Sequence, residues 1–234
     1  MENIQNTFEQ IGGTFVTSIQ EIARKKKKIK AFLFDWDGVF NAGYKGEGAS
    51  SLFAEADSMA TNLIRFNYWF KHRELPFTGI ITGENNQSAI QLSKRERFQA
   101  VYFKIKNKAD ALKDLEERYG VLPEEVCYFF DDVLDLPIAK VCGLRVLLNR
   151  TASPVFKAYM INNQLCDYIT AHSGGEHGVR EAGELLLSID GSFNTVVEER
   201  LAYSENYQQY IAERNAQVPE YFIQEAGAIQ PHQL

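Results

Sequence analysis

The chain has 234 residues, of which 45% are hydrophobic and 24% charged, and its formal net charge is −6. This length supplies a substantial core, while the negative charge argues against a general nucleic-acid binder. No apolar run reaches the length of a membrane-spanning helix. We therefore expect a globular protein whose partners include neither nucleic acid nor membrane. Three cysteines and no secretory signal indicate a reducing, cytoplasmic location.

The N-terminal segment predicts a helical extension over residues 1–28. Apolar residues recur at spacings of three and four between residues 3 and 24, as in an amphipathic helix. Gly12 and Gly13 weaken this helix or break it in two, because glycine is a poor helix former.

From residue 29 onward the sequence alternates between strands and helices. Short apolar runs predict strands at 30–35, 77–81, 100–103, 126–130, 144–148 and 167–170. Amphipathic segments predict helices at 57–72, 85–96, 108–119, 134–141, 154–163 and 178–189. Continuous apolar strands separated by helices are typical of a parallel sheet covered on both faces. We expect an α/β, Rossmann-like core over residues 29–189.

Two segments depart from this alternation. Residues 41–56 are rich in glycine and predict a small β-hairpin or flap. The short intervals around Thr82 leave no room for a large cap domain. Residues 190–234 are polar and aromatic, and we expect a C-terminal helical extension of one or two helices that packs on the core or on a neighbouring subunit.

The most informative stretch is the apolar strand that ends in Asp35-Trp36-Asp37-Gly38. Buried strands seldom end in two acids without a nearby cation, because uncompensated buried charge is costly. Two such carboxylates can hold Mg²⁺, and one can attack a phosphoryl group. Taken alone, the same residues also fit a turn in which both acids are solvated.

Polar residues follow three further predicted elements. Thr82-Gly83 ends a strand with a hydroxyl group that can bond a phosphate oxygen. Lys108 opens a helix, and the segment from Asp131 to Asp135 ends another strand with an acidic cluster. The carboxyl ends of parallel strands meet at one edge of a sheet, where ligands bind. We therefore expect these groups to meet Asp35 and Asp37.

This ordered set resembles the haloacid-dehalogenase superfamily of phosphotransferases, and within it the capless 3-deoxy-D-manno-octulosonate 8-phosphate (KDO 8-phosphate) phosphatase family. A second similarity is the segment Thr170–Glu181, which resembles the Gly-Gly-x-Gly-Ala-Val-Arg-Glu segment of that family with one extra residue. The resemblance implies a Mg²⁺-dependent phosphatase that hydrolyses a small phosphomonoester, such as a sugar-acid phosphate. It also implies a homo-oligomer, with a tetramer as the first expectation, because an open site needs a neighbouring subunit to cover it.

The resemblance also implies residue roles. Asp35 is the expected nucleophile, and Asp37 the expected general acid and base. The expected metal ligands are the Asp35 carboxylate, the Asp37 backbone carbonyl and Asp131, while Asp132 or Asp135 acts through water or Lys108.

For substrate binding, the resemblance implies that Thr82, Gly83 and Lys108 hold the phosphoryl oxygens. Arg180 either meets a substrate carboxylate or only pairs with charges on its own helix.

Three departures from the family pattern concern the substrate. Phe130 replaces a glycine, Glu84 replaces an arginine, and Asp57-Ser58 replaces Asp-Gly. Phe130 either crowds the metal site or points into the core. These departures also motivate two alternatives: a non-catalytic or regulatory protein of the same fold, and a phosphatase for other sugar phosphates or nucleotides.

Overall fold

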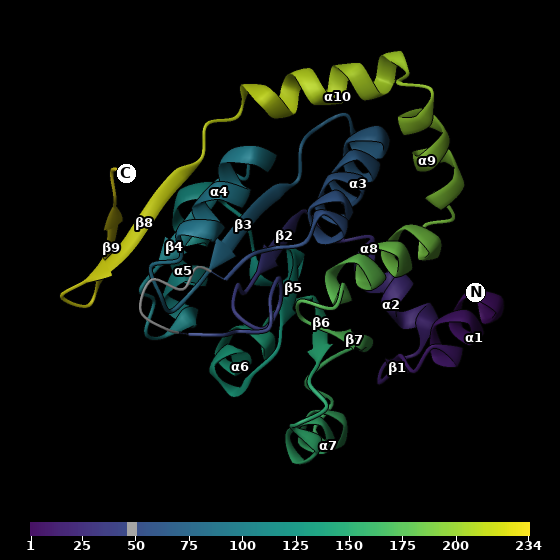
Figure 1. The fold of residues 1–234 in the computed structure, drawn as a ribbon, viewed down its shortest axis with the longest axis horizontal. Helices are drawn as coiled ribbons and strands as arrows, with labels where there is room; N and C mark the ends of the chain where they lie inside the picture. The colour runs from purple at the N-terminus through teal and green to yellow at the C-terminus, as the bar shows by residue number, and fades with distance from the viewer. Residues whose placement is uncertain (46–50) are drawn as a thin grey trace.

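The computed structural model describes residues 1–45 and 51–234, and the described strands form one sheet with helices on both faces (Figure 1). The strands are β1 (Thr14–Phe15), β2 (Ala31–Phe34), β3 (Phe77–Ile81), β4 (Ala100–Phe103), β5 (Val126–Phe130), β6 (Leu144–Asn149), β7 (Tyr168–Ser173), β8 (Glu220–Glu225) and β9 (Ala228–Pro231). Their order is β1-β7-β6-β5-β2-β3-β4-β8-β9. The seven strands from β7 through β5, β2 and β4 to β8 in this order pair in parallel. The outermost strands, β1 and β9, pair antiparallel with β7 and β8. The expected α/β, Rossmann-like sheet is therefore confirmed, with an antiparallel strand at each edge.

The central strands bring the predicted motifs to one edge of the sheet. In β2, Phe34 lies opposite Ile80 of β3 and Phe129 of β5. The three strands are buried along their whole length, as their continuous apolar sequences predict. Because the three strands run in the same direction and in register, the residues that follow them emerge side by side.

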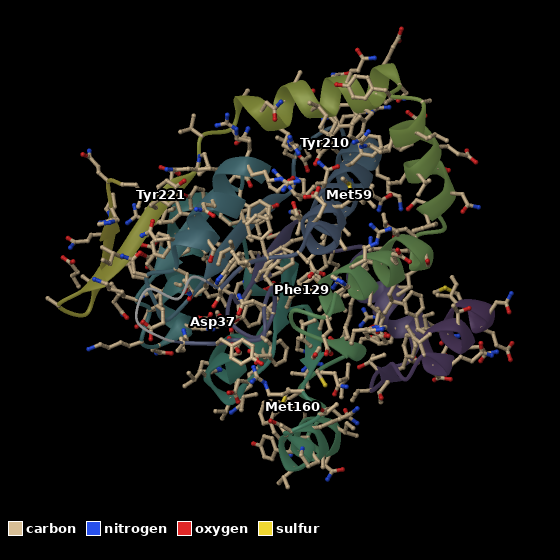
Figure 2. The ribbon with its side chains drawn as sticks, in the orientation of Figure 1. Asp37, Met59, Phe129, Met160, Tyr210 and Tyr221 are labelled. Atoms are coloured by element: carbon tan, nitrogen blue, oxygen red, sulfur yellow. The ribbon has the colours of Figure 1, made fainter. Side chains whose placement is uncertain are left out.

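Helices cover the two faces of the sheet and enclose two separate apolar clusters. The helices are α1 (Glu2–Gln10), α2 (Ile19–Lys26), α3 (Glu55–His72), α4 (Gln87–Glu96), α5 (Lys108–Tyr119), α6 (Leu136–Ala139), α7 (Pro154–Asn162), α8 (Gly178–Ile189), α9 (Phe193–Leu201) and α10 (Glu205–Ala216). One cluster joins the sheet to α1, α2, α3, α4, α8, α9 and α10, and the other joins it to α5, α6 and α7. Phe129, central in Figure 2, belongs to the first cluster, and its neighbour Phe130 belongs to the second. This alternation is that of a strand buried on both faces.

The N-terminal segment is broken at its glycines, as predicted. Helix α1 ends at Gln10, Gly12 has a φ of 105°, and α2 begins only at Ile19. Between the two helices, β1 pairs with β7 and becomes one edge of the sheet.

The C-terminal segment differs from the expectation of helices alone. Helices α9 and α10 lie on the outer side of α3 and α8, and Tyr210 of α10 points toward α3, where its hydroxyl donates to the Asn62 carbonyl at 3.2 Å (Figures 1 and 2). The chain then forms β8 and β9 at the far edge of the sheet. Tyr221, Phe222 and Ile223 favour a strand and pair with the free edge of β4, which outweighs the polar residues around them. The division at residues 28/29 and 189/190 stays a prediction.

The predicted flap over residues 41–56 lies partly outside the described residues, because 46–50 are not described. In its described portion, Asn41 forms an isolated β-bridge with Asp37, which precedes the flap. Within the described parts of the chain, no helix is both long and apolar enough to cross a bilayer.

Candidate active site

A cavity of about 320 Å³ lies at the carboxyl edge of the central strands. It is lined by side chains and backbone from the ends of several elements: Asp35, Asp37, Gly43, Lys45, Thr82, Gly83, Glu84, Ile105, Lys106, Lys108, Asp131, Asp132, Leu134, Asp135 and Arg150. All the expected site residues except Arg180 are among them. The sheet register explains this convergence, because each motif directly follows a parallel strand or opens the next helix.

Lys108 lies between two of the acids at the bottom of the cavity. Its Nζ atom is 2.5 Å from Asp35 Oδ1 and 2.6 Å from Asp135 Oδ1. Lys108, Asp35 and Asp135 are all buried. Burial opposes the ammonium charge, but the Asp35 and Asp135 carboxylates outweigh it and raise the pKa of Lys108. Lys108 is therefore a fixed cation beside the expected nucleophile.

Asp135 also holds the turn that follows β5. The Tyr128 hydroxyl donates to Asp135 Oδ1, and the backbone N–H of Asp132 donates to Asp135 Oδ2 at 3.3 Å. Asp132 Oδ1 accepts from the N–H of Val133 at 2.7 Å. Of the two acids, Asp135 is thus the one that contacts Lys108, while Asp132 caps the turn.

Three carboxylates approach closely enough to share a cation. Asp35, Asp131 and Asp135 each place an oxygen atom within 4.8 Å of the other two, and all three are buried. Burial and repulsion by Asp135 raise the pKa of Asp35, although Lys108 opposes this, and they raise that of Asp131 to about 6. When all three acids are ionised, their charge is −3 and that of Lys108 and Arg150 is +2, so the group keeps one uncompensated negative charge.

The chemistry of this group fits Mg²⁺. Carboxylate oxygens are hard ligands of the kind that Mg²⁺ prefers, and a bound cation relieves the repulsion that raises these pKa values. Arg150 contacts Asp131 through its guanidinium, but its side chain is 39% exposed and has room to turn away. The cluster contains Asp135 where the expected carboxylate set has only Asp35 and Asp131, and the expected contribution of the Asp37 carbonyl stays a prediction.

Gly38 permits this arrangement through its lack of a side chain. Its φ is 85°, and a Cβ at this position would lie 2.0 Å from Asp131 Oδ2. Two features therefore require glycine after the two acids: the left-handed backbone conformation and the close approach of Asp131.

Asp37 lies at the mouth of the cavity. Asp37 Oδ2 accepts from Lys45 Nζ at 2.5 Å and from Asn86 Nδ2 at 3.0 Å, and Ser51 Oγ donates to Asp37 Oδ1 at 3.4 Å. Lys45 is more than half exposed, so this carboxylate faces the part of the cavity that is open to solvent.

The Thr82 hydroxyl is buried and available as a donor. Its oxygen accepts from Asn86 Nδ2 at 2.9 Å and from the N–H of Glu84 at 3.3 Å. Both contacts use the oxygen as an acceptor, and no described residue accepts the hydroxyl hydrogen, so it can be donated to a ligand oxygen. Asn86 therefore connects Thr82 to Asp37 and orients both.

Arg180 lies outside the cavity. It is in the first turn of α8, and its Nε donates to Glu184 at 2.6 Å on the same helix. Its backbone N–H donates at 2.9 Å to the buried Asp57 carboxylate, which caps the positive end of α8. The chain geometry favours the second interpretation of Arg180, pairing on its own helix, and makes Asp57 part of the scaffold.

The other two departures have different surroundings. Phe130 is fully buried and stacks on Tyr128, with ring centroids 5.5 Å apart, so it points into the core and leaves the metal site open. Glu84 lines the cavity, is exposed, and has no ion-pair partner among the described residues. It places a free negative charge at the entrance.

Three cationic residues that line the cavity, Lys45, Lys106 and Arg150, were not predicted as part of the site, nor was Asn86, which bonds Asp37 and Thr82 beside it. Arg150 follows β6 directly, so the rule that located the other motifs applied to it as well. Asn86 carries no comparable signal, since an asparagine before a helix is usually only a cap.

Comparison with known proteins supports the resemblance to the KDO 8-phosphate phosphatase family. No family model matches the chain. The 3-deoxy-D-manno-octulosonate 8-phosphate phosphatase of Escherichia coli K12 is 28% identical over 178 residues, which cover 74% of this chain and 87% of that protein. The corresponding protein of Salmonella typhi is 28% identical over 177 residues and covers the same shares.

Solved structures share the fold. A probable YrbI family phosphatase from Pseudomonas syringae superposes with a TM-score of 0.63 at 26% identity, covering 78% of this chain and 98% of that one. The KDO 8-phosphate phosphatase of Moraxella catarrhalis, solved with magnesium, phosphate and KDO, gives a TM-score of 0.64 at 25% identity and covers 77% and 98%.

Proposed function

We propose that this chain, a KDO 8-phosphate phosphatase-like member of the haloacid-dehalogenase superfamily in sequence and fold, is a Mg²⁺-dependent phosphatase of small sugar phosphates. One observation carries the proposal. Two acids that follow one strand share a cavity with a buried lysine, a free threonine hydroxyl and a cluster of three carboxylates. A site built only for binding has no need of a buried nucleophile beside an acid at the cavity mouth.

In the proposed reaction, an Asp35 oxygen attacks the phosphorus atom and forms an aspartyl-phosphate. The bond from phosphorus to the leaving alkoxide breaks, and Asp37 in its protonated form donates its proton to that oxygen. Asp37 then accepts a proton from water, whose oxygen attacks phosphorus and releases inorganic phosphate. Asp35 is thereby regenerated as a carboxylate.

The remaining residues supply position and charge. Lys108 holds Asp35 in place and cancels part of the repulsion between its carboxylate and the phosphate dianion. Thr82 donates its free hydroxyl hydrogen to a phosphoryl oxygen, and Asn86 orients both Thr82 and Asp37. Mg²⁺, held by Asp35 and Asp131, would supply the further positive charge that phosphoryl transfer requires.

The substrate class follows from the relatives and from the entrance of the cavity. The curated relatives are named for KDO 8-phosphate, and the Moraxella structure contains KDO, so this sugar acid is the first substrate to test. Lys106 and Arg150 at the entrance suit an anionic sugar, while Glu84 opposes one. Neutral sugar phosphates therefore belong in the same test.

The function is tested by measuring phosphate release with Mg²⁺ over a panel of sugar-acid phosphates, sugar phosphates and nucleoside monophosphates. Wild-type protein should hydrolyse at least one sugar phosphate, and Asp35→Asn should abolish the activity. Hydrolysis that persists in Asp35→Asn would refute the nucleophile assignment. Lack of activity on the whole panel would favour a non-catalytic protein of this fold.

We further infer a homo-oligomer, with a tetramer as the first expectation. The cavity is open, and the exposed side chains of Tyr44 and Leu52 lie beside a second, apolar hollow next to the flap. Sedimentation of a single monomeric species would overturn the oligomer.

We also infer a cytoplasmic location, because three buried free cysteines suit a reducing compartment.

A further inference from the structure

The segment between β4 and α5 carries one wall of the active site, and the C-terminal hairpin of β8 and β9 lies against it (Figure 1). Ile105, Lys106 and Lys108 of this segment line the cavity. Residues 100–103 of β4 pair in register with 220–223 of β8, so Gln224 comes level with the start of the segment. The hairpin and the active-site wall are therefore direct neighbours.

Gln224 contacts both sides of this wall. Its Oε1 accepts from the backbone N–H of Lys106 at 2.9 Å, and its Nε2 donates to Asp110 Oδ2 at 2.9 Å. Lys106 and Asp110 lie on either side of Lys108, the cation that contacts Asp35. A single amide group thus connects the loop to the first turn of α5.

The loop needs such support because its backbone is strained. Lys104 has a φ of 51°, a left-handed conformation that costs free energy in a residue other than glycine. On the inner side, the N–H of Ile105 donates to the Thr82 carbonyl at 3.1 Å, and Asn107 caps α5 by accepting from the N–H of Ala109 at 3.2 Å. Gln224 supplies the corresponding contacts on the outer side.

The hairpin is itself firmly held. Phe222 is buried, stacks on Tyr102 with centroids 4.9 Å apart, and lies under the Arg118 guanidinium at 4.8 Å. The Tyr119 hydroxyl donates to Glu220 at 2.6 Å. Because β8 is packed against both β4 and α5, its position is a fixed reference for Gln224.

We propose that Gln224 is a positioning residue of the phosphatase reaction, which fixes the loop before α5 so that Lys108 meets Asp35 and the scissile phosphate. This proposal rests on the proposed function. Gln224 touches no reacting atom and acts only through the backbone of Lys106 and the side chain of Asp110.

The test compares Gln224→Ala with Gln230→Ala, a glutamine of the same hairpin whose exposed side chain bonds Glu225 at 2.8 Å and no other described residue. Loss of positioning should lower kcat on the order of tenfold and change KM less than about twofold, since the substrate contacts other than that of Lys108 persist while the alignment of Lys108 is lost. Gln230→Ala should keep wild-type kcat and the same Tm. Equal kcat in Gln224→Ala and wild type would overturn the proposal.

A rescue variant separates positioning from a general loss of structure. Gln224→Glu alone cannot donate to Asp110 and should also lose activity. Combined with Asp110→Asn, it restores the bridge with donor and acceptor exchanged, because the new amide donates to the new carboxylate. The double variant should recover most of kcat, and a double variant as slow as Gln224→Glu would contradict the proposal.

Amide hydrogen exchange gives a readout that needs no turnover. The Lys106 N–H should exchange faster in Gln224→Ala than in wild type and Gln230→Ala. Unchanged exchange would overturn the positioning role. If wild-type protein hydrolyses no substrate, the proposed function fails, and the exchange measurement still shows whether Gln224 holds the loop.

Discussion

Replacing Lys108 with methionine tests the electrostatic core of the site. Methionine keeps most of the side-chain volume and removes the charge that lies 2.5 Å from Asp35 and 2.6 Å from Asp135. Without Mg²⁺, the variant leaves these two acids and Asp131 buried together, and among the described residues Arg150 is the one cation that still contacts any of the three. The chain must then either protonate a carboxylate or lose stability.

The expected size follows from burial. Removing one partner of a buried ion pair costs about 3–5 kcal/mol, because the other charge is left uncompensated. In a chain of this size, each kcal/mol lowers Tm by about 2–4 °C, so Lys108→Met should melt about 6–20 °C below wild type in EDTA near neutral pH. Lys108 lowers the pKa of Asp35 against burial and Asp135 repulsion, so the pKa rises further in the variant. A group with a raised folded-state pKa stabilises the fold below its unfolded-state pKa and loses this contribution as pH rises. The Tm difference between Lys108→Met and wild type should therefore shrink as the pH is lowered.

The assay is thermal unfolding in EDTA and in Mg²⁺ at several pH values, beside phosphate release. The matched control is Lys113→Met on the same helix, whose side chain is 78% exposed and which should change stability by less than about 0.5 kcal/mol. Mg²⁺ should restore part of the stability of Lys108→Met and none of its activity. A variant that melts with wild type in EDTA at neutral pH would refute the reasoning that Lys108 compensates these acids.

Three further predictions concern the metal ligand, the glycine and the entrance. Since burial and Asp135 raise the pKa of Asp131 to about 6, the increase in Tm caused by Mg²⁺ should be large above pH 6 and should become smaller at lower pH. An increase that does not depend on pH would contradict Asp131 as a metal ligand. Gly38→Ala should weaken Mg²⁺ binding and activity through the 2.0 Å contact of its Cβ with Asp131. Gly120→Ala, with a similar left-handed φ of 67° and open space around its Cβ among the described residues, should cost stability alone, and equal activity losses in the two variants would refute this contact. Glu84→Gln should raise kcat/KM about two- to fivefold more for a sugar-acid phosphate than for a neutral sugar phosphate, and equal effects on the two substrates would exclude charge recognition at Glu84.

Local sequence patterns predicted the central fold well. The bounds of β3, β4, β5, α5 and α8 agree with the predicted segments, because each is a clear apolar run or an amphipathic stretch with a defined start. Strand β8 was missed because its polar neighbours hide a short apolar run. Its formation depends on the free edge of β4, which only the folded sheet provides.

The site was predictable where a motif follows a strand. Asp35, Thr82 and Asp131 were predicted in this way, and the sheet register brings them to one cavity, while their roles stay predictions. Gln224 was not found, because it lies more than a hundred residues from Lys106 and the two meet only through the pairing of β4 and β8. Contacts of this kind depend on topology rather than on local sequence.

Acid-quenched turnover of the Asp37→Ala variant tests the central claim most directly. Without its base, the variant should form the aspartyl-phosphate faster than it hydrolyses it, provided the substrate has a good leaving group such as p-nitrophenol. Peptide mass mapping should then locate one phosphoryl group on Asp35, and the same experiment with Asp35→Asn in addition should show none. Phosphoryl transfer to another residue, or substrate cleavage by a protein that never carries phosphate on Asp35, would contradict the account.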